Sequence, residues 1–328
     1  MKVSTLIEII ERFLRNVCDF GICTAFRREY NDLMYHATHN YKYRDRYISV
    51  VQQYLRMFSK DIIEKYSDYN LSDTQPQKMV WVCWWQGECE MPEWIKMCYT
   101  NLKHSIPSDF TLTLITKSNF QQYVKLPQVL IEKRDKNIIP ITQFSDIIRN
   151  GLLSQKGGLW LDASIWVNEK YWSIVKWDSQ FWSVKLKTIH RPEMTGQVVS
   201  GCKWSSFNMY GKRGNVINSF VFDAMVKFYT NHNQTLDYFG QNHFIRIAYD
   251  MIPTAHELIE LIPYNNPDIY ALPDLVYRNE VFNQDVWDRL NQRTGLFKIT
   301  QKRKYLSDIH GEKTYYGHFK EIYESYKK

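Results

Sequence analysis

The sequence predicts an α/β protein with a mostly parallel central sheet, flanked by helices and preceded by a helical region. Residues 79–85 and 111–116 are short apolar runs of the length of strands, and a helical pattern lies between them. Strand, helix and strand make a βαβ unit, which is typical of a parallel sheet. The apolar residues between 159 and 167 read as a third strand, buried on both faces as parallel strands usually are.

The first 75 residues contain no strand signal, and their early apolar residues recur at helical spacing. These residues are Leu6, Ile9, Ile10, Phe13, Val17 and Phe20. The polar segment 72–77 contains a proline and predicts a boundary, so that residues 1–75 form a helical region and residues 76–328 the main domain. The apolar stripe would either dock on that domain or lie on a membrane surface.

Further helices are expected within the main domain. One begins near Pro92, a second spans 141–155, and two more cover 218–229 and 238–251. On the second helix Asp146 and Arg149 are three residues apart and therefore lie on one face. They form either a surface ion pair or part of a binding site.

Composition narrows the classes of partner. The chain of 328 residues has a net charge of +7 with 11 Trp and 23 Tyr, a combination that suits sugars, bases and phosphates. Its basic residues are scattered and form no basic helix, so nucleic acid is not expected as a partner. The sequence shows neither a signal-peptide core nor a long apolar run, so we expect a cytoplasmic protein. Peripheral contact with the inner face of the membrane is compatible with this expectation.

The segment from Gly157 to Ser164 is the strongest local signal. Gly157 and Gly158 give a turn with free φ, and an apolar strand leads from them to Asp162. An unpaired buried carboxylate is costly, so we expect Asp162 at the strand's carboxyl end, facing a metal, a ribose hydroxyl or a basic side chain.

Three motifs in this order resemble the capsular polysaccharide synthesis protein family. They are Trp84-Trp85-Gln86-Gly87, Ser145-Asp146-Ile147-Ile148-Arg149 and Gly157-Gly158-Leu159-Trp160-Leu161-Asp162-Ala163-Ser164. The resemblance covers about residues 78–320. That family looks like a branch of the retaining GT-A glycosyltransferases, whose sugar-binding region contains a DxD motif. The resemblance therefore implies a GT-A-like, Rossmann-like fold for the main domain.

The resemblance also implies roles for individual residues. Asp162, Asp146 and Arg149 would carry the catalysis: Asp162 as the first acid of DxD near the ribose, Asp146 on a sugar hydroxyl, and Arg149 on the sugar or phosphate. Donor binding would further involve Trp84, Trp85, Gln86, Gly157 and Gly158, with Trp85 stacking on the base. The C-terminal tail would close over the diphosphate, with Lys302, Lys304 and His318 as candidate ligands.

Two departures from the pattern matter. The second acid of DxD is Ser164 here, and a hydroxyl is a poorer ligand than a carboxylate for Mg²⁺ or Mn²⁺. A divalent cation, if used, would be held by Asp162, Ser164 and His318. His243 lacks the nearby acid expected of the family and is either a core residue or an acceptor contact.

The function implied is that of a retaining glycosyltransferase that moves a sugar, in the first instance from a UDP-sugar, onto a lipid-linked oligosaccharide acceptor in capsular or exopolysaccharide synthesis. The alternative is a catalytically inert nucleotide- or carbohydrate-binding protein that kept the fold and lost the metal.

Overall fold

The computed structural model describes residues 3–69, 74–189, 195–300 and 303–327. It begins with the predicted helical region, which forms α1 (Val3–Phe20), α2 (Ile22–Thr38), α3 (Tyr41–Phe58) and α4 (Lys60–Tyr66). Residues 72–73 of the predicted boundary segment 72–77 lie outside the described residues, and the division into two domains stays a prediction. In the described part of the chain, no helix is both long and apolar enough to cross a bilayer.

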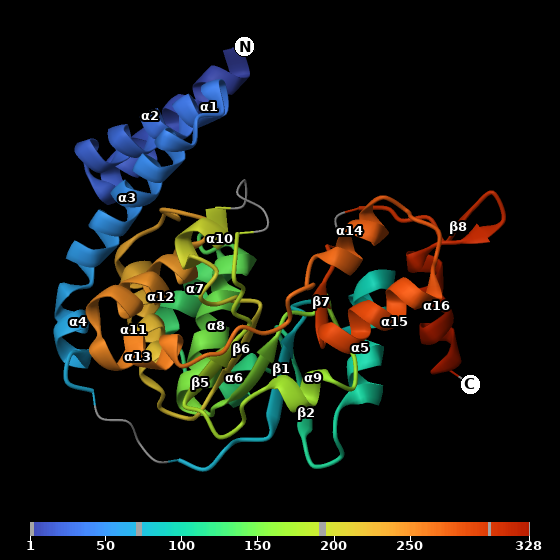
Figure 1. Ribbon diagram of the computed structural model, residues 1–328. Helices are drawn as coiled ribbons and strands as arrows, with labels where there is room; N and C mark the ends of the chain where they lie inside the picture. Colours follow the sequence, from blue (N-terminus) through green and yellow to red (C-terminus); the bar gives the residue numbers. More distant parts are fainter. Residues whose placement is uncertain (1–2, 70–73, 190–194, 301–302, 328) are drawn as a thin grey trace.

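The helical region is attached to the main body through α3, α4 and the C-terminal end of α1. Helices α3 and α4 pack on α12 (Gly240–Met251) and α11 (Val216–Asn231) of the main body. Tyr47 Oη donates to Asp237 at 2.7 Å, and Tyr66 Oη donates to Asp223 at 2.9 Å. The hairpin of α1 and α2 turns at Gly21 (φ 77°) and projects away from the body (Figure 1). Docking therefore accounts for α3, α4 and the end of α1, where Phe20 packs on Phe228 and His232. The remainder of the α1 and α2 hairpin extends beyond the docked part.

The central sheet has five strands in the order β2-β1-β3-β6-β5. They are β1 (Met79–Cys83), β2 (Thr111–Ile115), β3 (Gly158–Leu161), β5 (Phe181–Ser183) and β6 (Asn208–Gly211). β1 pairs in parallel with β2 and β3, as predicted, but β6 is antiparallel to both β3 and β5. The sheet is thus mixed rather than clearly mostly parallel. β5 and β6 are very short and fully buried, so their sequences do not alternate between apolar and polar residues in a way that would reveal a strand.

The run between 159 and 167 is not one strand. After β3 the chain turns at Asp162, where Ile165 N donates to the Asp162 carbonyl at 3.0 Å, and β4 (Ile165–Val167) joins a separate sheet. There β4 pairs antiparallel with β7 (Leu296–Lys298). Burial on both faces was predicted correctly for both pieces, but a continuously apolar run does not show where its direction changes.

Two groups of helices lie on either side of the sheet (Figure 1). The first group packs around α11 and α12 and contains α7 (Gln128–Asp135), α8 (Ile141–Gln155), α10 (Thr195–Ser200), α11 (Val216–Asn231), α12 (Gly240–Met251) and α13 (Pro253–Glu260). The second group packs around α5 and β7 and contains α5 (Glu93–Ser105), α14 (Ala271–Tyr277), α15 (Gln284–Arg293) and α16 (Tyr315–Ser325). The predictions of α5, α8, α11 and α12 are confirmed.

Short elements complete the described chain. They are the 3-10 turn η1 (Glu88–Glu90), α6 (Phe120–Tyr123), α9 (Tyr171–Ile174) and the hairpin β8 (Asp308–Ile309) with β9 (Glu312–Lys313). Much of the tryptophan content serves the core, since Trp81, Trp160, Trp182 and Trp204 are fully buried. The aromatic surplus is therefore in large part a packing feature, although Trp84 and Trp85, like Trp172, Trp177 and Trp287, are only half-buried.

Candidate functional site

Asp162 lies directly after β3, at the carboxyl end of the parallel strands, as the sequence predicted. Its Oδ1 accepts hydrogen bonds from Arg149 Nη2 and from Trp160 Nε1, both at 2.9 Å. Its Oδ2 accepts from Lys298 Nζ at 2.8 Å. Two cations and an indole thus surround one carboxylate, which keeps a side-chain exposure of 26%. The carboxylate is paired yet remains open to a ligand.

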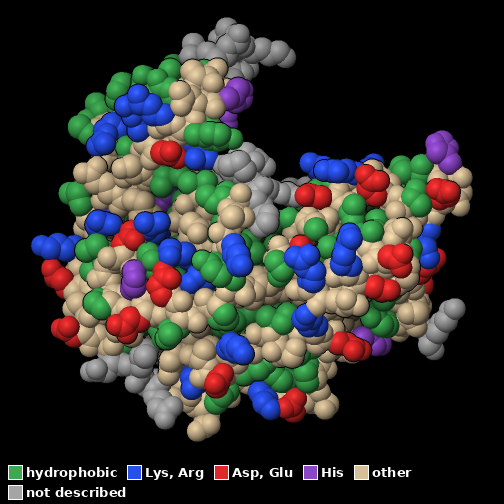
Figure 2. Space-filling model, in the orientation of Figure 1, with side chains coloured by type: hydrophobic (Ala, Val, Ile, Leu, Met, Phe, Trp, Pro, Cys, Tyr) green, Lys and Arg blue, Asp and Glu red, His purple; other side chains and the backbone are tan. Residues whose placement is uncertain are grey.

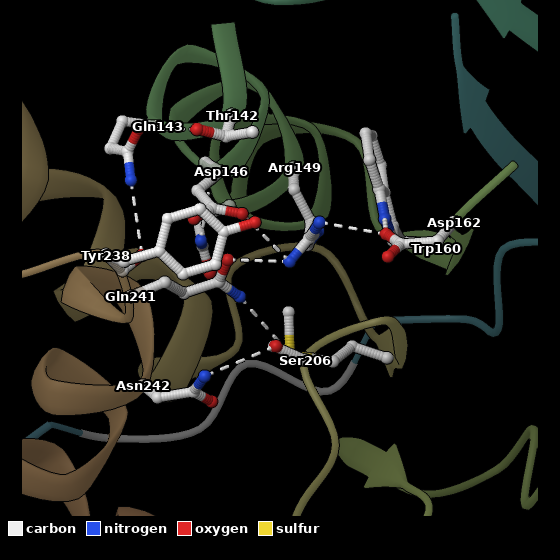
Figure 3. Close-up of polar contacts among 12 residues, drawn as sticks. Thr142, Gln143, Asp146, Arg149, Trp160, Asp162, Ser206, Tyr238, Gln241 and Asn242 are labelled. Atoms are coloured by element: carbon white, nitrogen blue, oxygen red, sulfur yellow. Dashed lines mark hydrogen bonds and ion pairs between the residues drawn. The ribbon is translucent and has the colours of Figure 1, made fainter. Parts of the chain in front are cut away.

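Arg149 joins three separate elements at this point (Figure 3). Arg149 lies on α8, and its Nη1 is 3.1 Å from Asp146 Oδ1 of the same helix. Nη1 also donates to Gln241 Oε1 of α12 at 2.7 Å, and Nη2 donates to Asp162 Oδ1 after β3. The guanidinium also stacks over Trp160, 4.8 Å from the ring centroid. Asp146 and Arg149 therefore belong to a buried cluster and do not form a surface ion pair.

The two carboxylates of this cluster differ in charge preference. Burial raises the pKa of Asp146 to about 6, against the opposing effect of Arg149 and with the help of Asp162. Burial acts in the same direction on Asp162, but Lys298 and Arg149 outweigh it and hold the pKa of Asp162 below its ordinary value. Paired acids with separated pKa values are typical of functional sites.

Lys298 occupies the place between Asp162 and Ser164. Its Nζ donates to Asp162 Oδ2 and to Ser164 Oγ, each at 2.8 Å. These are two of the three positions that the resemblance assigns to a divalent cation, the third being His318, and an ammonium already bridges them. No group of three or more His, Cys, Asp or Glu side chains suited to a metal occurs among the described residues. The side chains at this position therefore do not fit a divalent cation.

Comparison with known proteins gives one clear result. A family model described as capsular polysaccharide synthesis protein matches residues 31–319. The chain belongs to this family. No curated protein and no solved structure matches it. The match begins within α2, well before the stretch that the sequence motifs had suggested, so most of the helical region belongs to the length that the family model describes. Family membership points to a role in capsular polysaccharide synthesis.

The first of the three motifs that resemble this family lies at the edge of the cluster. Trp85 follows β1, and its ring packs at 5.5 Å from Phe144 of α8 and at 5.3 Å from Phe120. Trp84 Nε1 donates to the Glu90 carbonyl at 3.3 Å, and Gln86 is exposed. Since β1 and β3 are parallel neighbours, this motif and Asp162 share the carboxyl edge of the sheet. Trp85 thus packs against core aromatic rings and is half-buried.

The structure places other predicted site residues elsewhere. Gly157 and Gly158 lie at the opposite end of β3 from Asp162, where Trp81 Nε1 donates to the Gly157 carbonyl at 2.8 Å. A Cβ on Gly158 (φ 104°) would lie 2.6 Å from the Met79 carbonyl oxygen, so this glycine is required for packing β3 against β1. The two glycines are not brought to the acidic cluster.

His318, a candidate in the C-terminal tail, is also apart from the acidic cluster. The His318 ring stacks on Phe282 at 3.9 Å and packs edge-on against Trp287, and no described contact joins it to Asp162. Lys304 is exposed, and Lys302 lies outside the described residues. Neither His318 nor Lys304 therefore extends the cluster.

His243 is a core residue. It is fully buried, with Nδ1 at 2.7 Å from Gln52 Nε2 and Nε2 at 3.3 Å from Asp237 Oδ1. Asp237 is thus the acid that the sequence had not located near it. The contact between His243 and Gln52 joins α12 to α3. This structural role accounts for a histidine at this position without a contact to the acceptor.

Three residues of the cluster were missed from the sequence. Gln241 and Tyr238 lie in the segment that drew attention to His243, but their spacing gives no sign that they face Arg149. The Gln143 side chain holds the Tyr238 carbonyl at 3.2 Å, and the exposed phenol lies beside Asp146 in Figure 3. Burial, then Asp146 and Asp162, raise the pKa of Tyr238. Lys298 carries no local signal, because only the pairing of β4 with β7 brings it near.

Proposed function

We propose that the chain is a retaining glycosyltransferase with a GT-A-like main domain. It transfers a sugar from a nucleotide-sugar donor, with a UDP-sugar as the first class to test, onto a lipid-linked oligosaccharide in capsular polysaccharide synthesis. The observation that carries this proposal is the cluster of Asp146, Arg149 and Asp162 at the carboxyl edge of parallel strands, in a member of this family. Ligands of α/β proteins gather at that edge.

The cluster supplies the contacts that such a donor needs. Arg149 and Lys298 present positive charge for a diphosphate, and the planar guanidinium suits two-point binding of an oxyanion. Asp146 and Asp162 can accept hydrogen bonds from sugar and ribose hydroxyls. Trp85 and the exposed Tyr238 offer aromatic faces at the rim for the base or the sugar ring.

The chemistry breaks the bond between C1 of the sugar and the diphosphate oxygen, and that oxygen keeps the electron pair. The acceptor hydroxyl forms the new C1–O bond on the same face, and its proton passes to the departing phosphate. Negative charge therefore develops on the diphosphate, where preorganised cations stabilise it most. No covalent nucleophile is required.

The test is release of nucleotide by purified protein from UDP-, GDP- and CMP-sugars, alone and with lipid-linked glycan acceptors. Release of one nucleotide, faster with acceptor, would support the transferase. Saturable binding of a nucleotide sugar without release under any of these conditions would favour the inert binding protein instead. That alternative draws on two observations: Ser164 stands at the position of an acid, and Lys298 already pairs with Asp162.

The raised pKa of Asp146 predicts a pH-dependent activity. Because the ionised form is the better acceptor for sugar hydroxyls, turnover should rise with pH and level off above about 6. The stability of the fold should change in the opposite direction, because the folded protein favours the protonated form of Asp146. This contribution to the free energy of unfolding is complete below the ordinary pKa of 3.8 and is lost as pH rises through about 6. Turnover against pH, and melting of wild type and Asp146→Asn between pH 4 and 7, measure both.

Asp146→Asn has no carboxyl group at this position and should not show this loss of stability. The melting temperature of the wild type should therefore fall relative to that of the variant as pH rises from 4 to 7. Parallel melting curves for the two proteins would contradict the assignment.

Contact with the membrane that carries the acceptor is proposed for the projecting hairpin. Ile22, Phe26 and Leu33 stand exposed on α2, and basic residues such as Arg27 lie beside them. Figure 2 shows apolar and basic side chains together on this arm. Exposed apolar side chains with flanking Arg or Lys are typical of helices that lie in a lipid interface. The double variant Ile22→Ser/Phe26→Ser should therefore bind anionic vesicles about tenfold more weakly in a co-sedimentation assay.

Leu261→Ser is the matched control, because Leu261 is 77% exposed after α13, on the main body, and should not change vesicle binding. Equal binding by the double variant, or its loss of self-association rather than of vesicle binding, would show that something other than lipid covers the arm.

A further inference from the structure

Lys298 is held at the site by the main chain. It ends β7, where it is the register partner of Ile165, the residue after Ser164. The amide of Ile299 donates to the Ser164 carbonyl at 3.4 Å, which fixes the two segments beside each other. Strand pairing therefore brings the Lys298 backbone beside Ser164, and the hydrogen bonds to Asp162 and Ser164 hold the ammonium between them.

The charges of the cluster are balanced without a metal. Two carboxylates, Asp146 and Asp162, face two cations, Arg149 and Lys298, in contacts of 2.8–3.1 Å. Mg²⁺ requires oxygen ligands at about 2.0–2.1 Å, so an ion held by Asp162 and Ser164 would have to lie against the ammonium that both already bind. Like charges at such a distance repel strongly in a partly buried site.

Ser164 fits an ammonium better than it fits a metal. Its hydroxyl oxygen accepts a hydrogen bond from Lys298 at 2.8 Å and adds no charge. An acid at this position would give the cluster three carboxylates for two cations. The departure from DxD at Ser164 and the presence of Lys298 are thus two parts of one arrangement.

We propose that the Lys298 ammonium takes the place of the divalent cation of DxD transferases and binds the donor's diphosphate, so that transfer proceeds without a metal. This inference rests on the proposed function. An ammonium has three hydrogens, and the bonds to Asp162 and Ser164 account for two. The third serves a phosphate oxygen, and the side chain is 27% exposed, which leaves room for that contact.

In the transfer step Lys298 stabilises the leaving group. When the C1–O bond breaks, its electron pair stays on the terminal phosphate oxygen, beside the ammonium and the Arg149 guanidinium. The acceptor's oxygen bonds to C1, and the acceptor's proton ends on the released diphosphate. Lys298 keeps its own protons throughout, so it acts through charge alone.

The test is equilibrium binding of UDP and GDP by calorimetry, in excess chelator and with Mn²⁺ or Mg²⁺. The wild type should bind one of them equally well with chelator and with metal. Lys298→Met, which keeps the length and removes the charge, should weaken diphosphate binding about 10–100-fold. Its binding of the corresponding nucleoside should stay unchanged. Lys298→Arg, which keeps the charge, should retain a larger part of the affinity.

Lys60→Met is the matched control, since Lys60 is 81% exposed at the start of α4 and should not affect binding. Binding that the chelator abolishes and Mn²⁺ or Mg²⁺ restores would overturn the inference and leave the transferase standing. Lys298→Met with wild-type affinity for the diphosphate would also overturn it. If the wild type binds neither UDP nor GDP in any of these conditions, the proposed function fails, and this inference with it. The wild-type chelator comparison does not depend on the folding of any variant.

Discussion

Asp162→Asn is expected to lower turnover of the nucleotide sugar by about 10²–10³-fold while the protein remains folded. Asp162 is the shared acceptor of Arg149, Lys298 and Trp160. An asparagine keeps one oxygen but turns an NH₂ group toward one of these donors, and it leaves two cations without their common anion. The cations then separate, and the diphosphate no longer meets both. Nucleotide release and a melting curve for the same preparation measure the effect.

Asp109→Asn is the control for this substitution. Asp109 pairs with Lys78 at the surface, so the same chemical change there should leave turnover unaltered. Full activity in Asp162→Asn, with a normal melting curve, would remove Asp162 from the site. Equal losses in both variants would indicate a general effect of charge and not of this carboxylate.

The helices and the first strands could be predicted because their signals are local. The spacing of apolar residues on α8 places its limits at Ile141 and Gln155, and β1, α5 and β2 follow the expected order. Asp162 was predicted at a strand end because an unpaired carboxylate is costly inside an apolar run. Each of these inferences depends on a window of fewer than about 18 residues.

The remaining parts depend on contacts between distant segments. The pairing of β4 with β7 places Lys298 beside Asp162, 136 residues earlier in the chain, and nothing near residue 298 marks this. The same pairing explains why the run from 159 to 167 divides between two sheets. The glycines before β3 suggested a ligand-binding turn, yet Gly158 serves the close packing of β3 on β1. A glycine signal is the same in both cases, so only the fold distinguishes them.

Arg149→Lys is expected to damage both stability and activity. The Arg149 side chain is only 7% exposed and connects Asp146 on α8, Gln241 on α12 and Asp162 after β3. A single ammonium cannot span these three acceptors, because the guanidinium reaches them with two nitrogens set apart in one plane. We expect a loss of about 2–4 kcal/mol in the free energy of unfolding. Turnover should fall by at least about 100-fold, since the fork that meets the phosphate is gone.

Arg246→Lys is the control for this substitution. It makes the same change of residue at a site where the planar guanidinium does not connect several elements. Arg246 forms a surface pair with Asp250 on α12, and its replacement should cost less than about 0.5 kcal/mol. Denaturant unfolding gives the stability of both variants, and nucleotide release at saturating donor gives the turnover. If Arg149→Lys were stable but inactive, the guanidinium would act on the donor alone. If it were unstable but fully active at low temperature, Arg149 would hold α8, α12 and β3 together without touching the substrate, and the diphosphate would depend on Lys298.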